Sequence, residues 1–321
     1  MSAQLQGRAS LDEPVQGEFR VRRLRAGFAT SLDGDRIRTK VELNLAPREL
    51  ELIEVWGERQ FGPGSVRIGV LKAPFTTYRD TSSRALALTE WSPVTRAFGS
   101  ERQVGAMVAG SHAGWHGALA ITQGQSTRTS HGQGAADLSG SAACAWAALD
   151  GPACKLRGVA PELTVRVGWN GTGMEDRVFD EVGGSPRGAW SVSAGVDTGP
   201  DPLLDLGSRV AVEGTLALYR LTLQAGVYGA TVHDRERWVP GLYGGRAQVT
   251  WAAHRHLLLA GRTSWVQSLG RASIWRRGEL VGGVTVPILG HDIRWQLDGG
   301  VLTGDDAGPV GVVRTMLQLS T

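Results

Sequence analysis

An alternation of polar and apolar residues with a period of two runs through most of this chain and constrains its fold more than any other feature. In the segment 36–45 (RIRTKVELNL), one face carries Ile37, Thr39, Val41, Leu43 and Leu45, and the other carries Arg36, Arg38, Lys40, Glu42 and Asn44. Successive side chains of a strand point to opposite sides, so this segment predicts a β-strand with one apolar and one charged face. In a soluble sandwich the apolar face would meet a second sheet, whereas in a membrane barrel it would meet lipid.

About sixteen segments of this kind follow one another, and no convincing helix lies among them. The predicted strands are 2–10, 19–31, 36–45, 50–59, 65–73, 102–111, 114–122, 156–169, 188–196, 208–218, 221–232, 241–252, 256–268, 278–288, 292–302 and 310–320. A strand and its connection average about twenty residues, as expected for tilted strands of roughly ten residues that cross a bilayer. We therefore predict an all-β protein, a transmembrane antiparallel β-barrel of about 16 strands that forms one domain over residues 1–321.

The connections between these strands alternate in length, which favours the membrane barrel. Short turns on the periplasmic side and long loops on the extracellular side are typical of outer-membrane barrels. The longest loops are 74–101 and 123–155, whereas the connections 46–49 and 170–187 break the alternation. The terminal segment 310–320 alternates to its end, so we expect it to pair with the first strand and to close the barrel.

Composition agrees with this interpretation. The chain has 45 glycines, which disfavour long helices, and it has no run of about 18 apolar residues that could form a membrane-spanning helix. It has eleven tryptophans, a residue that is enriched at membrane interfaces. Those near predicted strand ends are Trp56, Trp115, Trp169, Trp190, Trp251 and Trp265. They are expected to form an interfacial girdle; the alternative is that they lie in the core of a soluble β-protein.

Motifs for catalysis, metal binding and cofactor binding are missing, so we expect no enzyme and no cofactor. The segment 33–35 (DGD) lacks the spaced ligands of a calcium loop and predicts a hairpin turn. His254 and His256 alone do not make a metal site. A formal net charge of +3 gives no indication of nucleic-acid binding.

The two cysteines, Cys144 and Cys154, lie in one segment rich in Gly, Ala and Ser. Without further Cys or His nearby they make a poor zinc site. In an oxidising compartment they are a disulfide candidate, and two free buried thiols are the alternative.

The first residues show no basic segment followed by an apolar stretch, so we expect no signal peptide in this chain. A cytoplasmic protein would have such a beginning, and so would a mature exported protein. The barrel pattern favours the second alternative, with the bacterial outer membrane as the location and the signal peptide removed.

Cations on the polar faces of the strands, and in the loop 74–101, indicate an anion-binding pore lining. The candidates are Arg23, Arg25, Arg36, Arg38, Lys40, Arg67, Lys72, Arg84, Arg96 and Arg102. Rows of Arg and Lys in a narrow pore attract anions and let them pass. Because Arg20 and Arg22 have the opposite parity to Arg23, the pattern predicts either a bulge near Arg22 or a position above the membrane for Arg20 and Arg22.

Several of these stretches resemble the phosphate-selective porin O and P family of outer-membrane porins. The matching segments are 19–25 (FRVRRLR), 40–44 (KVELN), 69–75 (GVLKAPF), 81–83 (TSS), Glu90 with Ser92, and 102–105 (RQVG). The resemblance covers the first third of the chain, and beyond about residue 120 only the strand rhythm and the terminal strand agree. It implies a sixteen-stranded, usually trimeric porin that passes phosphate along Arg and Lys. It also implies that Lys72, Arg102, Arg23 and Arg25 occupy family positions.

This sequence departs from the family pattern at several positions. Val70 replaces a Gln, and Trp91 replaces the Arg that usually follows the loop Glu, although Arg84 and Arg96 flank it. No second row of cations is readable in the C-terminal half. The expected function is an outer-membrane porin with mild selectivity for small, phosphate-like anions. Its expected surroundings are a lipid bilayer, and a homotrimer is the assembly considered. The alternative is a non-conducting structural or docking barrel whose lumen is plugged.

Overall fold

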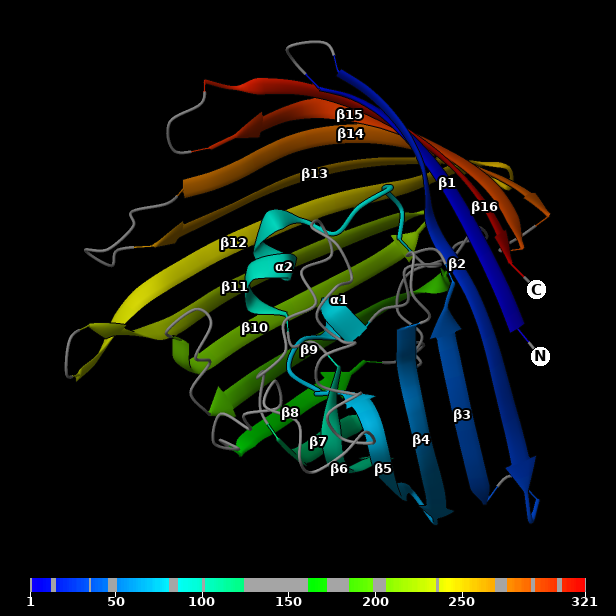
Figure 1. Cartoon of the computed structure of the whole chain (residues 1–321), viewed down its shortest axis with the longest axis vertical. Coiled ribbons are helices and arrows are strands. Elements are labelled where there is room, and N and C mark those ends of the chain that lie inside the picture. Colours follow the sequence, from blue (N-terminus) through cyan, green and yellow to red (C-terminus); the bar gives the residue numbers. More distant parts are fainter. Residues whose placement is uncertain are drawn as a thin grey trace, which may run out of the picture.

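The computed structural model describes residues 2–12, 16–34, 36–45, 51–80, 86–99, 102–123, 161–171, 185–198, 206–234, 237–268, 276–289, 292–304 and 308–320. Within these ranges sixteen antiparallel strands form one closed barrel (Figure 1). The first eight are β1 (Ser2–Asp12), β2 (Gln16–Leu32), β3 (Ile37–Asn44), β4 (Glu51–Phe61), β5 (Gly64–Lys72), β6 (Arg102–His112), β7 (Trp115–Thr122) and β8 (Glu162–Asn170). The last eight are β9 (Ser185–Thr198), β10 (Leu206–Tyr219), β11 (Leu221–Asp234), β12 (Arg237–His254), β13 (Leu257–Ser268), β14 (Arg276–Leu289), β15 (Ile293–Thr303) and β16 (Val310–Ser320).

Closure of the barrel occurs where it is predicted. β16 pairs with β1 from Gln4 opposite Ser320 to Asp12 opposite Val312, and β1 also pairs with β2. The sheet therefore has no free edge, which removes the unpaired backbone groups that an open sheet would present. The predicted all-β transmembrane fold and its strand number are confirmed.

The outer face of the strands is apolar, as a lipid-facing surface requires. Large hydrophobic side chains stand exposed all round the barrel, among them Phe28 at 55%, Ile68 at 62%, Val227 at 63% and Leu280 at 67%. A soluble sandwich would cover these side chains with a second sheet, so the pattern decides between the two alternatives for the alternating segments.

Most of the tryptophans expected at an interface lie on this outer face. Trp115, Trp190, Trp251 and Trp265 are between 44% and 56% exposed, and Trp169 packs edge-on against Trp115 with ring centroids 4.8 Å apart. Trp56 departs from the prediction. It lies on the same strand face as the buried carboxylates Glu54 and Glu58, and the guanidinium of Arg67 lies 4.2 Å from its ring centroid.

The parity conflict in the Arg-rich strand β2 is resolved by a bulge. Gln6 lies opposite Arg23 and Gly7 lies opposite Val21, so Arg22 has no partner on β1. One extra residue changes the parity of a strand, so the structure supports the bulge, the first of the two alternatives that the sequence leaves open here.

The short turns use backbone conformations that suit tight hairpins. Asp33 and Gly34 have φ of 53° and 61°, and Ala113 and Gly114 have φ of 49° and 87°. Ala113 and Gly114 are the two residues between the paired His112 and Trp115, and positive φ at both matches the twist of the flanking strands. The hairpin predicted at 33–35 is confirmed, since Leu32 pairs with Ile37 and the Arg36 N–H donates to the Asp33 carbonyl oxygen at 3.2 Å.

The expectation that no helix is present is wrong, because the connection between β5 and β6 contains two short ones. They are α1 (Thr77–Asp80) and α2 (Pro93–Phe98). α2 begins with a recognisable cap, since the Ser92 hydroxyl accepts a hydrogen bond from the Thr95 backbone N–H and Pro93 is the first helical residue. Among the described residues no helix is long and apolar enough to cross a membrane.

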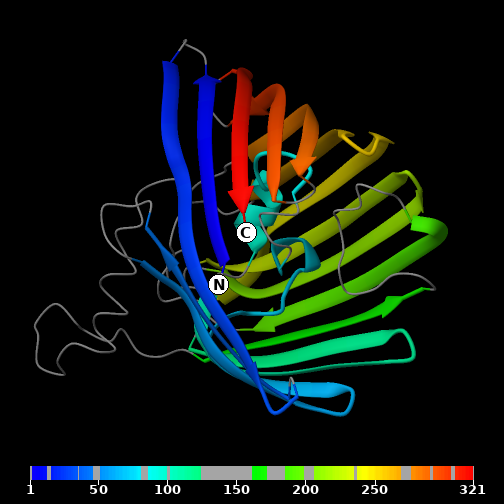
Figure 2. The same ribbon diagram turned by 90° about the vertical axis from the view of Figure 1, so that its right-hand side faces the viewer.

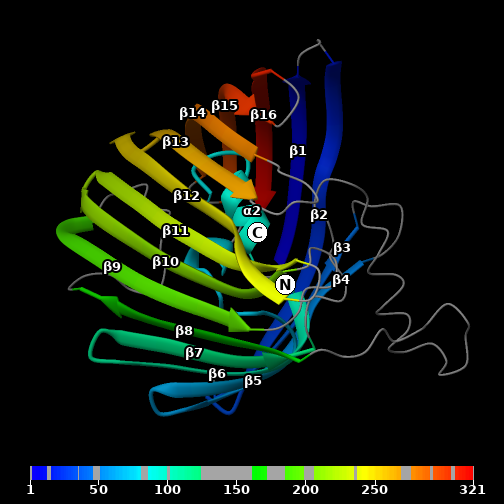
Figure 3. The ribbon, with the colours of Figure 1, turned by 90° about the vertical axis from the view of Figure 1, so that its left-hand side faces the viewer.

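The connection with these helices (residues 73–101, described at 73–80 and 86–99) is called the inner loop below. Three views agree that α1 and α2 lie within the curve of the sheet and not above its end (Figures 1, 2 and 3). The inner loop therefore occupies part of the barrel interior.

Candidate functional site

The inner loop packs against one wall of the barrel through an apolar cluster. Phe75, Tyr78, Val94 and Phe98 from the loop contact Ala211, Tyr228, Ala230, Leu242 and Val266 from β10 to β13. The rings of Phe98 and Tyr228 stack with centroids 5.4 Å apart. Val94 and Phe98 have no exposed surface, so the loop has a core of its own inside the barrel.

Three glycines on the inner face of this wall make room for the loop. An added Cβ would lie 2.1 Å from the Phe75 carbonyl oxygen at Gly195, 2.7 Å from Val94 at Gly244 and 2.8 Å from Leu88 at Gly283. Such distances are far below van der Waals contact. Larger residues at these positions would hold the loop away from the strands.

Polar groups of the same wall bind the backbone of the loop. Oε2 of Glu213 on β10 accepts a hydrogen bond from the Thr77 backbone N–H at 2.6 Å. The Tyr78 hydroxyl donates to the carbonyl oxygen of Gly214 at 2.6 Å, and burial raises the pKa of Tyr78 above its ordinary value. Further along, Arg262 on β13 donates to the Glu90 carbonyl oxygen at 2.7 Å.

Two buried ion pairs support these contacts. Arg262 pairs with Glu279 on β14 at 2.6 Å, and Arg314 on β16 pairs with Asp298 on β15 at 2.5 Å. Asp298 also accepts hydrogen bonds from the loop residue Thr89. The charged groups of the C-terminal wall are thus largely occupied with one another and with the loop.

A third buried group lies where the loop ends. Arg209 on β10 forms ion pairs with Glu162 and Asp197 on β8 and β9, and Nη1 of Arg209 lies 3.5 Å from the Phe98 carbonyl oxygen. Its guanidinium also lies 5.3 Å from the ring centroid of Phe75. One arginine therefore contacts both ends of the described loop.

The N-terminal strands carry a different arrangement, called the charged wall here and defined by Arg25, Lys40, Glu42, Glu54, Lys72 and Arg102. Arg25 pairs with Glu42 at 2.9 Å, Lys40 bridges Glu42 and Glu54 at 2.7 Å each, and Arg102 pairs with Glu54 at 2.8 Å. Lys72 donates to the Arg79 carbonyl oxygen of the loop at 3.3 Å. Cations outnumber carboxylates in this set, so its net charge is positive.

The predicted pore-lining cations divide between this wall and other places. Arg36 and Arg38 are exposed beside the short turn that precedes β3. Arg67 pairs with Glu58 at 2.7 Å, one layer closer to the short turns than the charged wall, and Arg96 pairs with Glu90 within the inner loop. Arg84, Cys144 and Cys154 lie outside the described residues, as does the loop 124–160, and the side chain of Arg23 is not described.

The structure also corrects the expectation that the C-terminal half has no row of cations. Five arginines project inward from β10, β12, β13, β15 and β16: Arg209, Arg246, Arg262, Arg294 and Arg314. Each lies on the polar side of an alternating strand, so period-two parity could have found them. The sequence alone does not show them as a row, because each strand carries few inward cations and their alignment depends on the register between strands.

Trp91 replaces the arginine of the family pattern, but its side chain lies next to a different cation. Trp91 is 7% exposed, and the guanidinium of Arg79 lies 4.7 Å from its ring centroid. A cation over an indole ring is an attractive arrangement. Positive charge therefore stays near this part of the loop although the residue differs.

Comparison with known proteins adds evidence on the fold. Neither a known family profile nor a curated protein sequence matches the chain. Among solved structures, the chain is similar to OmpT of Vibrio cholerae in its trimer form, an outer-membrane protein, with a TM-score of 0.66 at 10% identity, covering 100% of this chain and 98% of that one. OprB of Pseudomonas putida gives 0.65 at 9% identity, with 100% and 93% covered.

A mutant of the Rh. blastica porin gives a TM-score of 0.56 at 10% identity, with 100% of this chain and 99% of that chain covered. Identities this low establish the architecture alone. The chain has the fold of bacterial outer-membrane β-barrels, including porins.

Proposed function

We propose that this protein is a porin of the bacterial outer membrane that lets small solutes diffuse passively and favours anions over cations. The observation that carries the proposal is the charged wall, with its excess of cations, inside a barrel that the inner loop narrows from the opposite side. Fixed positive charge beside a constriction concentrates anions and raises their rate of passage.

The degree of selectivity follows from the pairing within the charged wall. Glu42 and Glu54 neutralise part of the positive charge, and the side chain of Lys40 keeps 29% of its surface exposed. An anion would meet accessible cations that are already partly satisfied. It would therefore bind weakly enough at each step to be released, which favours a mild preference over tight capture.

Phosphate-like oxyanions are the proposed preferred anions. The support is the resemblance of the first third of the chain to phosphate-selective porins, including the segment 69–75 and the cations Lys72 and Arg102. These two residues lie directly opposite each other in the register of β5 and β6, where the inner loop begins and ends. Guanidinium and ammonium groups suit oxyanions because they give charge-assisted hydrogen bonds.

The proposal further includes one barrel domain, no enzymatic activity, no cofactor and assembly as a homotrimer. Within the described ranges, no three His, Cys, Asp or Glu side chains gather where they could hold a metal ion. The trimer rests on analogy with the Vibrio cholerae protein, whose solved structure is described as a trimer form.

A second candidate is a barrel that does not conduct, because the tightly packed inner loop fills part of the lumen. The two are separated by reconstituting the purified chain in planar bilayers and in liposomes. A porin gives stepwise openings in the bilayer and swelling of liposomes in small neutral solutes. A plugged structural barrel gives neither, and its absence of conductance would persist when the voltage and the salt are changed.

A further inference from the structure

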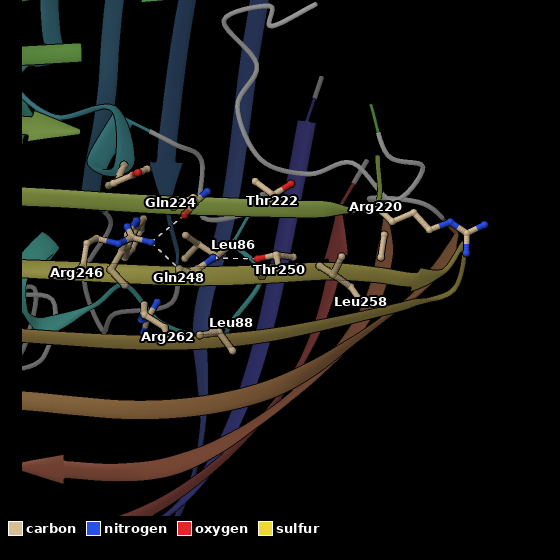
Figure 4. A pocket seen from close by; sticks show the side chains of 14 residues that line it. Leu86, Leu88, Arg220, Thr222, Gln224, Arg246, Gln248, Thr250, Leu258 and Arg262 are labelled. Atoms are coloured by element: carbon tan, nitrogen blue, oxygen red, sulfur yellow. Dashed lines mark hydrogen bonds between the residues drawn. The ribbon is translucent and has the colours of Figure 1, made fainter. Parts of the chain in front are cut away.

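A second polar surface faces the inner loop, on the side away from the charged wall. A cavity of about 50 Å³, counted as the space open to the centre of a water molecule, lies between residues 86–91 of the loop and the strands β11 to β13 (Figure 4). The residues that line it include Arg220, Arg246 and Arg262 and no Asp or Glu. The local charge is therefore positive.

Arg246 is the cation in this lining that has hydrogen-bonding capacity left. Its Nη2 donates to Oε1 of Gln224 at 3.0 Å and to Oε1 of Gln248 at 2.9 Å, and its guanidinium lies 4.0 Å from the ring centroid of Tyr78. Its Nε is buried and has no acceptor. Among the described residues no carboxylate pairs with it, whereas Arg262 is fully engaged with Glu279 and the Glu90 carbonyl oxygen.

The loop side of the same cavity is apolar. Leu86, Leu88 and Trp91 line it, and Tyr78 closes it beneath the guanidinium of Arg246. The strand side continues with hydroxyl and amide groups, since Gln248 donates to the Thr250 hydroxyl oxygen at 3.3 Å (Figure 4). A ligand with one anionic end and one apolar end would therefore match both sides of this cavity.

The volume limits the size of such a ligand. At roughly 10–15 Å³ for each water-sized group, the cavity of about 50 Å³ holds about three to five non-hydrogen atoms. A short aliphatic carboxylate such as acetate or propionate has the right size and the right two ends.

We propose that this cavity is a binding site for small organic carboxylates, with the carboxylate on Arg246 and the alkyl group against Leu86, Leu88 and Trp91. This inference rests on the proposed porin function and names a solute class for it. The guanidinium supplies charge-assisted hydrogen bonds to the carboxylate, and the loop supplies an apolar surface that an inorganic anion cannot use.

The test is saturation-transfer NMR on the whole chain folded in detergent micelles, with sodium propionate as the probe and its methyl protons observed. We expect transfer to propionate that excess sodium chloride or phosphate of equal ionic strength reduces only slightly. Arg246→Gln should weaken propionate binding by about tenfold, because a charge-assisted contact is lost. Arg246→Lys should keep most of the propionate binding. The weaker binding of Arg246→Gln could then not be explained by a general loss of folding at this position.

Two further variants serve as a control for the lost charge and as a test of the apolar contact. Arg38→Gln removes an exposed cation outside the cavity and should leave binding unchanged. Leu86→Ser should weaken propionate but leave formate unaffected, since formate has no alkyl group. Equal binding of propionate by the wild type and Arg246→Gln would overturn the proposal, as would full displacement of propionate by an equal concentration of phosphate.

Bilayer conductance of the same preparations keeps the two proposals apart. Open, anion-favouring channels without transfer to propionate would overturn the carboxylate site and leave the porin function standing. Specific transfer to propionate in a barrel that never opens would support the site and remove the channel function.

Discussion

Thr89 of the inner loop and Asp298 of β15, which are 209 positions apart in the chain, are joined by two hydrogen bonds to one carboxylate oxygen of Asp298. The Thr89 backbone N–H and hydroxyl both donate to Oδ2 of Asp298, at 2.7 and 2.6 Å, while Oδ1 accepts from Nε of Arg314 at 2.5 Å. All three residues are at most 5% exposed. This carboxylate joins the loop to the barrel wall, so the position of the loop depends on it.

Replacement of that carboxylate should loosen the loop. In Asp298→Asn the buried Arg314 loses its ion pair, and the amide cannot satisfy all three donors. We expect a loss of about 3 kcal/mol in the free energy of unfolding, together with larger fluctuations of the open-channel current. Urea unfolding in lipid bilayers, followed by tryptophan fluorescence, measures the free energy of unfolding. Single-channel recording measures the current fluctuations.

Asp33→Asn is the matched control, because Asp33 is exposed in a hairpin turn. Asp33→Asn should leave the free energy of unfolding and the current fluctuations equal to those of the wild type within error. A wild-type unfolding curve and a quiet current in Asp298→Asn would show that the Thr89–Asp298 contact does not hold the loop.

The charged wall predicts a change of ion selectivity with a definite sign. Glu54 neutralises Lys40 and Arg102, so Glu54→Gln should raise the ratio of chloride to potassium permeability. A unit charge at about 10 Å changes the energy of a passing ion by about 0.4 to 1.4 kcal/mol, which corresponds to about twofold to tenfold. The zero-current potential in a potassium chloride gradient measures this ratio.

Lys40→Gln serves as the opposite-sign partner, because it removes a positive charge from the same ion-pair chain. It should lower the chloride preference. If both substitutions moved the potential in the same direction, or neither moved it, the charged wall would not be part of the conduction path.

The glycines beneath the loop give a prediction about packing. Gly195→Ala places a Cβ where the Phe75 carbonyl oxygen lies, so we expect the loop to shift and the protein to lose about 1–3 kcal/mol of stability. Conductance should change at the same time. Thermal unfolding in micelles and bilayer recordings are the measurements.

Gly261→Ala is the corresponding control on the same barrel. Its added Cβ would meet only Val249, at an ordinary 3.7 Å. This variant should behave as the wild type does. An equal loss of stability in both variants would mean that glycine is required for strand conformation and not for space beneath the loop.

Much of the barrel could be predicted from the sequence, because membrane strands obey a local rule. Period-two alternation in segments such as Ile37–Asn44 depends only on neighbouring residues. The parity of β2 likewise indicates a bulge near Arg22 as one of two alternatives. The apolar outer face and the pairing of β1 with β16 follow from the same rule together with the need to leave no sheet edge.

The interior could be predicted less well, because it depends on which strands face which part of the loop. Nothing near Thr89 in the sequence indicates Asp298, and nothing near Phe75 indicates Gly195. The helix α2 has a local signal in Ser92 and Pro93, but a helix of six residues has too little periodicity to be recognised. The sequence indicates the cations of the charged wall as candidates. Their ion-pair partners and the alignment of the inward arginines of β10 to β16 can be predicted only when the register between strands is known.

The excess of cations on the charged wall should make this barrel a channel that favours anions. The most direct test is the zero-current potential of the wild-type protein in a planar bilayer under a potassium chloride gradient, with sodium phosphate then added to one side. We expect a potential displaced toward the chloride equilibrium potential and a reduced chloride current when phosphate is present. A potential on the potassium side, or no openings at all, would contradict this expectation.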